Sequence, residues 1–157
     1  MAKLLPIIIN PDPILRKKSL PVANDDIATK KMQVLFADMS KTMIEKDGVG
    51  LAAPQIGKNI RIITISTKDG TICMANPKIT RKSWAKEWNE EGCLSVPGVF
   101  GKVSRHKKVN CIYTDKDGKK TKIEASGLMA FVIQHEIDHL DGVLFIDKAK
   151  DIKKIEI

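Results

Sequence analysis

Residues 126–142 of the chain read SGLMAFVIQHEIDHLDG, and this stretch decides how the rest of the sequence is interpreted. Its apolar residues, among them Leu128 and Val132, recur at the spacing of an amphipathic α-helix. Ser126 is placed to cap the first turn of that helix, and Gly142 is placed to end it. The stretch therefore predicts a helix late in the chain with one apolar face.

Two histidines of this helix, His135 and His139, lie four residues apart, which places their side chains on one face. Two imidazoles so placed can bind one metal ion, and Glu136 lies beside them, where it can accept a proton from a water molecule bound to the metal. The alternative is an amphipathic helix with two histidines that coincide by chance. Because the chain has only three histidines and two of them share the apolar stripe of this helix, the sequence favours a metal site.

A catalytic metal site needs three protein ligands and one open position for water. One class of metalloprotease supplies a third histidine six positions after the second, but this chain has Phe145 there, so the third ligand must come from upstream. His106 stands in a basic stretch and has the pattern of a surface residue. Cys93, between Gly92 and Leu94, does not fit the pattern of a buried apolar cysteine and is the better candidate. A Cys-His-His set is compatible with iron(II), zinc, cobalt or nickel.

The other two cysteines, Cys73 and Cys111, lie in strand-like apolar runs and are interpreted as small buried residues. An odd number of cysteines without a secretion signal argues against a disulfide framework. The apolar run at residues 4–9 contains Pro6 and is too short to cross a bilayer. We therefore expect a cytoplasmic protein.

The chain reads as one domain over residues 1–157, without a linker or an internal repeat. A helix is predicted to start near Asp25 or Asp26 and to end at Gly48. Strands and hairpin arms are predicted at 60–67, 71–75, 103–114 and 120–125, the last two joined around Asp117-Gly118. These elements predict an α+β fold, with antiparallel sheets packed around the C-terminal metal-binding helix and with an N-terminal helix.

The net charge of +8 arises from lysines that are spread along the whole chain. Such a distribution favours a solvated surface, and the alternative is attraction to an RNA-rich partner. With one Tyr and four Phe, the sequence shows no interleaving of aromatic and basic residues of the kind that binds single-stranded nucleic acid. Trp84 and Trp88 precede Cys93, and the sequence assigns them no function.

With these residues assembled, the chain resembles the peptide deformylase family in three separated motifs. The motifs are GVGLAAPQ at 48–55, EGCLS at 91–95 and HEIDHL at 135–140. Their order and spacing also match, and the resemblance extends from the N-terminal region to about residue 147.

The resemblance implies one divalent metal ion per chain, with the ligands Cys93, His135 and His139. Iron(II) is the first candidate for that ion, and zinc(II), nickel(II) and cobalt(II) are compatible alternatives. Glu136 would act as general base and then as general acid. Gln55 and the backbone N–H of Leu94 would stabilise the tetrahedral oxyanion, since preorganised donors aimed at developing charge are commonly the largest catalytic contribution.

The resemblance also implies the reaction, which is removal of the formyl group from N-formylmethionine at the start of newly synthesised polypeptides, with release of formate. The substrate backbone would lie as an extra strand beside the first motif, and the methionine side chain would enter an apolar pocket. The expected substrate-binding residues are Gly48, Val49, Gly50, Leu94, Phe131 and Val132.

Many bacterial members of the family continue into a C-terminal helix that docks on the ribosome, whereas this chain ends soon after Asp147. We therefore expect any ribosome association to use the basic surface, and we expect a monomer without membrane contact. Two other hypotheses stay open. A small metallopeptidase would apply the same chemistry to internal peptide bonds, and a module without activity would bind a structural metal or the ribosome. The presence of Glu136 argues against the inactive module.

Overall fold

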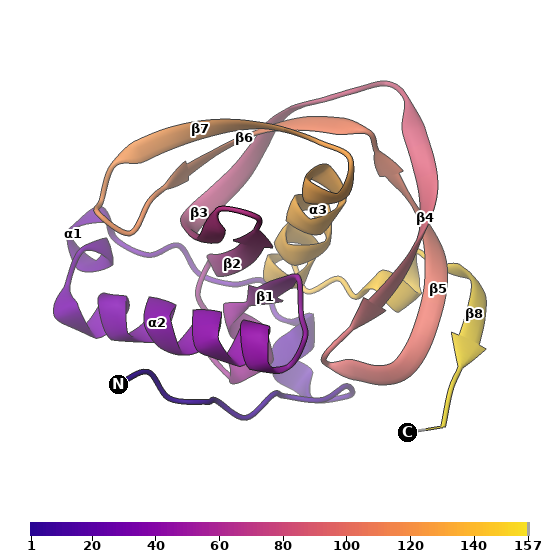
Figure 1. The fold of residues 1–157 in the computed structure, drawn as a ribbon, viewed down its shortest axis with the longest axis horizontal. Helices are drawn as coiled ribbons and strands as arrows, with labels where there is room; N and C mark the ends of the chain where they lie inside the picture. Colours follow the sequence, from indigo (N-terminus) through magenta and orange to yellow (C-terminus); the bar gives the residue numbers. More distant parts are fainter. Residues whose placement is uncertain (157) are drawn as a thin grey trace.

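In the computed structural model, which describes residues 1–156, two antiparallel sheets surround a late helix (Figure 1). Ile157, the last residue of the predicted domain, lies outside the described residues. The α-helices are α1 (Asn24–Ile27), α2 (Lys30–Glu45) and α3 (Leu128–Leu140), and three short 3₁₀ helices span Pro13–Arg16, Ala53–Ile56 and Phe145–Asp147. The predicted combination of helices with antiparallel sheets is confirmed.

The strands divide between a larger and a smaller sheet. The larger sheet contains β1 (Gly50–Ala52), β2 (Ile62–Thr67), β3 (Gly70–Lys82), β6 (Lys108–Thr114) and β7 (Lys120–Ser126), in the spatial order β1-β2-β3-β6-β7. The smaller sheet contains β4 (Lys86–Cys93), β5 (Val96–His106) and β8 (Lys150–Lys154), in the order β4-β5-β8. Strand β1 is thus an edge strand of the larger sheet.

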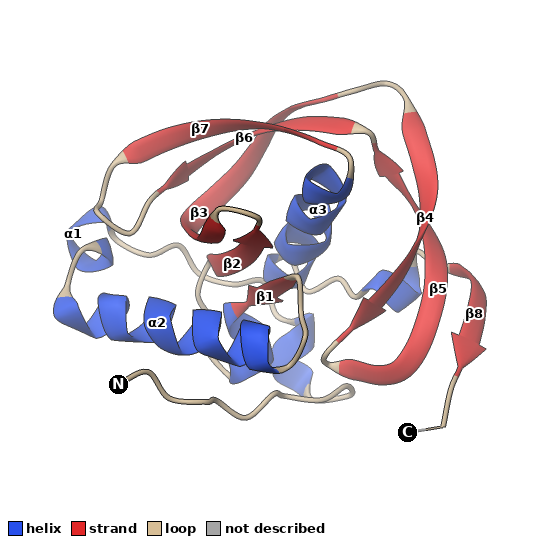
Figure 2. Cartoon of the chain, viewed as in Figure 1, coloured by secondary structure: helices blue, strands red, loops and turns tan. Residues whose placement is uncertain are grey.

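The two long helices cover opposite faces of the larger sheet (Figure 2). Because side chains alternate between the faces of a strand, Leu51 and Ile62 pack on the side of α2, whereas Ala52 and Ile63 pack on the side of α3. The smaller sheet lies on the far side of α3 and has its own buried cluster, which contains Val103 and residues of the segment after α3. Helix α3 is therefore held between the two sheets, and both can supply groups to a site beside it.

The N-terminal helix differs from the prediction. Neither Asp25 nor Asp26 is the N-cap of a long helix, because both lie inside the short α1. The chain extends again at Thr29, whose hydroxyl accepts a hydrogen bond from the backbone N–H of Met32 and caps α2. The predicted N-cap residues therefore belong to the short helix α1, which precedes α2. Helix α2 ends at Glu45, shortly before Gly48.

The late helix agrees with its predicted extent to within one residue, but the predicted N-cap was wrong. Ser126 is the last residue of β7, and Gly127 is the N-cap, without a side-chain cap. Gly127 has a φ of 63°, which lets the chain turn directly from strand to helix. Gly142 follows the helix with a φ of 75°, as expected for a residue that ends a helix.

The strand predictions were right in place and incomplete in extent. The predicted arm at 103–114 is two strands, β5 and β6, which separate at Lys107 and enter different sheets. Strand β3 is longer than the predicted 71–75, and β4 and β8 were not predicted as strands. Both are mostly exposed and rich in charged residues, so they lack the apolar pattern that marks a buried strand.

Candidate metal centre and substrate pocket

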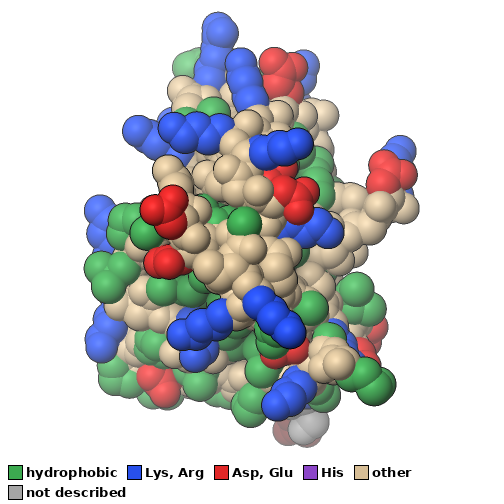
Figure 3. All heavy atoms as spheres, turned by 90° about the vertical axis from the view of Figure 1, so that its left-hand side faces the viewer, with side chains coloured by type: hydrophobic (Ala, Val, Ile, Leu, Met, Phe, Trp, Pro, Cys, Tyr) green, Lys and Arg blue, Asp and Glu red, His purple; other side chains and the backbone are tan. Residues whose placement is uncertain are grey.

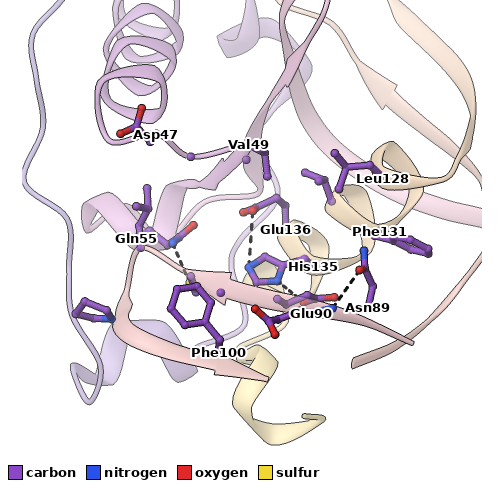
Figure 4. A pocket seen from close by; sticks show the side chains of 18 of the residues that line it. Asp47, Val49, Gln55, Asn89, Glu90, Phe100, Leu128, Phe131, His135 and Glu136 are labelled. Carbon is purple, nitrogen blue, oxygen red and sulfur yellow. Dashed lines mark hydrogen bonds and ion pairs between the residues drawn. The ribbon is translucent and has the colours of Figure 1, made fainter. Parts of the chain in front are cut away.

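A pocket of about 430 Å³ opens between α3, the start of β1 and the hairpin of β4 and β5 (Figure 4). Acidic residues, Asp47 and Glu90, lie at its rim, and polar side chains lie at its base. Its apolar lining consists of Val49, Leu94, Phe100, Leu128, Phe131 and Val132. The base is formed by Gln55, Cys93, His135 and Glu136. The pocket therefore joins an apolar cavity to a cluster of chemically reactive groups.

Three possible metal ligands meet at the base of this pocket. Cys93 ends β4, whereas His135 and His139 lie on one face of α3. One ligand atom from each lies within 4.8 Å of the other two, and the Cys93 Sγ is 3.3 Å from the His139 Nε2. The two imidazole rings stand at 74° to each other with centroids 5.0 Å apart. The structure thus brings together the three residues that the sequence analysis selected as ligands.

The electrostatics of this cluster suit a divalent cation. Burial lowers the pKa of His139 well below its usual value, so its imidazole is neutral, the form that binds metal. Burial also opposes charge on His135, but the hydrogen bonds to Cys93 and Glu91 outweigh that effect and raise its pKa to about 10. The surroundings of His135 therefore favour a positive charge, which either a proton or a metal ion can supply. A thiol and two imidazoles are a donor set that fits iron(II) and zinc alike.

Glu136 is buried beside the cluster. Its Oε1 lies 3.9 Å from the His135 Nε2, and its Oε2 has no hydrogen-bond partner among the described residues. Burial raises the pKa of Glu136 to about 7, against the opposing effect of a charge on His135. A carboxyl group with such a pKa can both accept and donate a proton near neutral pH.

Gly50 explains how Glu136 fits into this space. A Cβ atom on Gly50 would lie 2.6 Å from the Oε1 of Glu136 and 2.8 Å from its Cγ. At Gly50 the close approach is made by the carboxylate of Glu136.

Gln55 is fixed by hydrogen bonds on both ends of its amide. Its Oε1 accepts a bond of 2.9 Å from the backbone N–H of Ala52, and its Nε2 donates to the Ser95 Oγ at 3.1 Å. The same Nε2 lies 3.4 Å from the Cys93 Sγ, so the amide points at the ligand cluster (Figure 4). Ser95, fully buried, is the partner that the sequence analysis did not assign.

A network of ion pairs holds the His135 ring through its Nδ1 atom. Glu91 accepts a hydrogen bond of 2.7 Å at its Oε1 from the His135 Nδ1, and Arg105 donates to both oxygens of Glu91 at 2.8 and 2.9 Å. Arg105 also donates to Asp138 on α3 at 2.6 Å, and Lys148 pairs with the same carboxylate at 3.0 Å. Burial alone would raise the pKa of Glu91, but the bonds from Arg105 and His135 lower it to about 2.

This network of ion pairs was not predicted from the sequence. Arg105 stands next to His106, Lys107 and Lys108 and was interpreted as part of a basic surface stretch. The signal that could have found it is the spacing of two residues between Val103 and Arg105, which places both on the same face of a strand, here the buried face of β5. His106 lies away from the ligand cluster, with its Nδ1 2.6 Å from the carbonyl oxygen of Ser83. The six expected substrate-binding residues all line the pocket, and their role stays a prediction.

Comparison with known proteins settles the family. The family model for polypeptide deformylase matches residues 4–155. The chain belongs to this family. A peptide deformylase of Methylocella silvestris is 45% identical over 162 residues, which cover 98% of this chain and 81% of that protein. The family identifies the chain as a hydrolase of protein biosynthesis.

Solved deformylase structures share the fold. A peptide deformylase from Synechococcus elongatus in complex with actinonin superposes with a TM-score of 0.89 at 39% identity, covering 94% of this chain and 79% of that one. A class I type b deformylase from Acinetobacter baumannii with bound Met-Ala-Ser gives a TM-score of 0.90 at 33% identity, covering 94% and 99%. No helix among the described residues is long and apolar enough to cross a membrane.

Proposed function

We propose that the chain removes the formyl group from the N-terminal formylmethionine of newly synthesised polypeptides and releases formate in a metal-dependent reaction. The observation that carries this proposal is the convergence of Cys93, His135, His139 and Glu136 at the base of one apolar pocket. Such a cluster beside a carboxyl group is the arrangement that hydrolytic metal sites use.

Cys93, His135 and His139 would hold one divalent ion per chain, for which iron(II) is the first candidate and zinc, nickel and cobalt are compatible alternatives. When bound, such an ion acts as a Lewis acid and lowers the pKa of a coordinated water. Glu91 would fix the orientation of the His135 ring, because its carboxylate accepts from the second ring nitrogen at 2.7 Å. The HEIDH segment of α3 would thus be the metal-binding part of the fold.

Glu136 would move the proton that the reaction requires. It would accept a proton from the attacking water and then transfer it to the amine that leaves with the polypeptide. The Nε2 of Gln55 and the backbone N–H of Leu94 would donate to the oxygen of the formyl group as it gains negative charge. The two hydrogen bonds that hold Gln55 support this role, because a fixed donor need not reorganise during the reaction.

The substrate would bind along the free edge of β1. Among the described residues β1 pairs only with β2, so the other edge, beside Val49 and Gly50, can accept an extended peptide as an additional strand. The methionine side chain would enter the apolar part of the pocket between Leu94, Phe131 and Val132. The structure from A. baumannii with bound Met-Ala-Ser supports a peptide of this kind as the ligand.

We further propose that residues 1–157 form a single domain that acts as a monomer in the cytoplasm. Its basic surface, with a net charge of +8, would provide any contact with the ribosome.

Three peptides test the reaction. Formyl-Met-Ala-Ser should release formate and free Met-Ala-Ser, whereas acetyl-Met-Ala-Ser should react far more slowly because the acetyl methyl group must also fit beside the cluster. An internal peptide without a formyl group should stay intact. Cleavage of that internal peptide, with no formate from the first one, would favour a metallopeptidase instead.

A further inference from the structure

The outer face of the three-stranded sheet carries aromatic and basic side chains together. Directly paired residues of antiparallel strands point to the same face. Val103 and Arg105 on β5 are buried toward α3, so the residues that alternate with them, and the partners of those residues, point away from α3. The exposed residues of this outer sheet face, at the right-hand side of Figure 1, are Lys86, Trp88, Glu90, Lys102, Lys150 and Lys153, and the partly buried Phe100, Ser104 and His106 complete it.

This face is more strongly basic than the chain as a whole. It carries four lysines and one carboxylate, all exposed, compared with 27 basic and 19 acidic residues in the full sequence. On the face shown in Figure 3, by contrast, lysine and arginine side chains are scattered among acidic and apolar ones. The outer sheet face therefore carries positive charge with less acidic charge among it than the face in Figure 3.

Trp88 lies in the middle of these lysines with half of its surface exposed. The Nζ of Lys150, two strands away, lies 5.0 Å from the centre of the Trp88 ring, which places a positive charge directly against the indole. Trp84, in the turn before β4, is 97% exposed and adds a second indole near the start of the same strand.

We propose that the outer sheet face binds single-stranded RNA. Stacking of bases on aromatic side chains within a positively charged surface is the common mode of binding for single strands. Here Trp88 would stack on a base, while Lys102, Lys150 and Lys153 would pair with phosphates. The linear sequence conceals this arrangement, because the aromatic and basic residues become neighbours only across paired strands.

Other occupants fit the face less well. An anionic membrane surface would also attract the lysines, but membrane binding uses a continuous apolar face, whereas Trp88 here is surrounded by lysines. An acidic peptide would use the lysines but not the indoles. The choice of RNA over DNA rests on the proposed function, since newly synthesised polypeptides are found at the ribosome. The face adjoins the pocket through Glu90, which belongs to both.

The test measures binding of a fluorescein-labelled 12-nucleotide oligouridine to the metal-loaded protein by fluorescence anisotropy at low and moderate salt. Trp88→Ala should weaken binding at least about fivefold, and Trp88→Phe, which keeps an aromatic ring, should restore most of it. Lys102→Ala, Lys150→Ala and Lys153→Ala combined should weaken binding at least about tenfold and reduce its salt dependence. The matched control removes three lysines from β7 and the turn before it, Lys119, Lys120 and Lys122, and should have little effect.

Several results would overturn the proposal. They are absence of oligouridine binding by the unsubstituted protein, equal losses in the two triple variants, full binding by Trp88→Ala, or tighter binding to phosphatidylserine vesicles than to oligouridine. Formate release from formyl-Met-Ala-Ser is measured on the same samples and should be unchanged in every variant. Failure of the RNA proposal therefore stays distinguishable from failure of the proposed deformylation.

Discussion

At the scale of the residue, the site depends on how a few polar atoms are held. Glu136 is buried with one carboxylate oxygen near His135 and with the other unpartnered among the described residues. Gln55 is anchored by the backbone of Ala52 and by Ser95. Atoms that are fixed but not fully satisfied can engage a substrate without first breaking bonds within the protein.

Glu136→Gln should bind metal as the unsubstituted protein does and lose about 10²- to 10⁴-fold in kcat, because the amide cannot accept and return a proton. Metal content by atomic absorption and formate release by a coupled assay check both parts. Glu124→Gln, at an exposed position of β7, is the matched control and should keep full activity. A Glu136→Gln variant with near-normal kcat would show that another group moves the proton.

Gly50→Ala should lower kcat more than it lowers stability. The added Cβ would lie 2.6 Å from the Glu136 Oε1, so the carboxylate must move out of its position. We expect a loss of about 10- to 100-fold in kcat, because misplacing a catalytic group by about 1 Å can cost about 100-fold. Thermal unfolding monitored by circular dichroism should show a cooperative transition. Unchanged kinetics in the variant would mean that the position of Glu136 is not constrained as described.

At the scale of the element, Arg105 joins β5 of the smaller sheet to α3. Its guanidinium is almost fully buried and pairs with Glu91 on β4 and with Asp138 on α3. Glu91 in turn orients His135. One arginine therefore determines how the strand that carries Cys93 is placed against the helix that carries the two histidines.

Arg105→Ala should destabilise the protein by about 3–5 kcal/mol, because it removes the buried guanidinium that pairs with both Glu91 and Asp138. It should also weaken metal binding roughly 10- to 100-fold through the loss of support for His135. Urea unfolding and competition with a metal chelator measure the two effects. Arg16→Ala, which breaks the more exposed pair with Asp147, is the control and should cost less than about 1 kcal/mol. Equal effects of the two substitutions would contradict the supporting role of Arg105.

Elements with a clear apolar period were predictable from the sequence, and others were not. The helix at 128–140 and the hairpin around Asp117-Gly118 follow from local pattern and turn chemistry. Strands β4 and β8 carry charged residues on a solvent-facing sheet, so periodicity does not reveal them. The candidate ligands were found by residue type and spacing. The partners Ser95 and Arg105 were missed because their contacts lie on elements that are distant in the sequence. Ser95 contacts Gln55 on a 3₁₀ helix, and Arg105 contacts Glu91 on β4 and Asp138 on α3.

At the scale of the whole molecule, the ligand cluster connects parts that are far apart in the sequence. Cys93 ends a strand of the smaller sheet, and His135 and His139 lie on the helix between the sheets. A metal ion held by all three would cross-link the smaller sheet to α3. Because such an ion binds the folded chain through a preformed site, it should stabilise the fold.

Removal of the metal by a chelator should therefore lower the Tm. For an ion present at about 100 times its Kd the stabilisation is about 2.7 kcal/mol, which corresponds to a decrease of roughly 5–10 °C for a chain of this size. Differential scanning calorimetry with and without the chelator measures the change. His139→Ala should show a low Tm that no longer responds to the chelator. A Tm that is the same with and without metal would mean that the ion does not link these elements.

Formate release and metal content, measured together on the same samples, test the central claim most directly. The protein is purified without oxygen, loaded in turn with iron(II), nickel(II) and zinc(II), and assayed with formyl-Met-Ala-Ser. We predict formate release that requires bound metal and that disappears, together with the metal, in Cys93→Ala. Formate release by metal-free protein, or by Cys93→Ala, would contradict the assignment of the Cys93, His135 and His139 cluster as the active metal site.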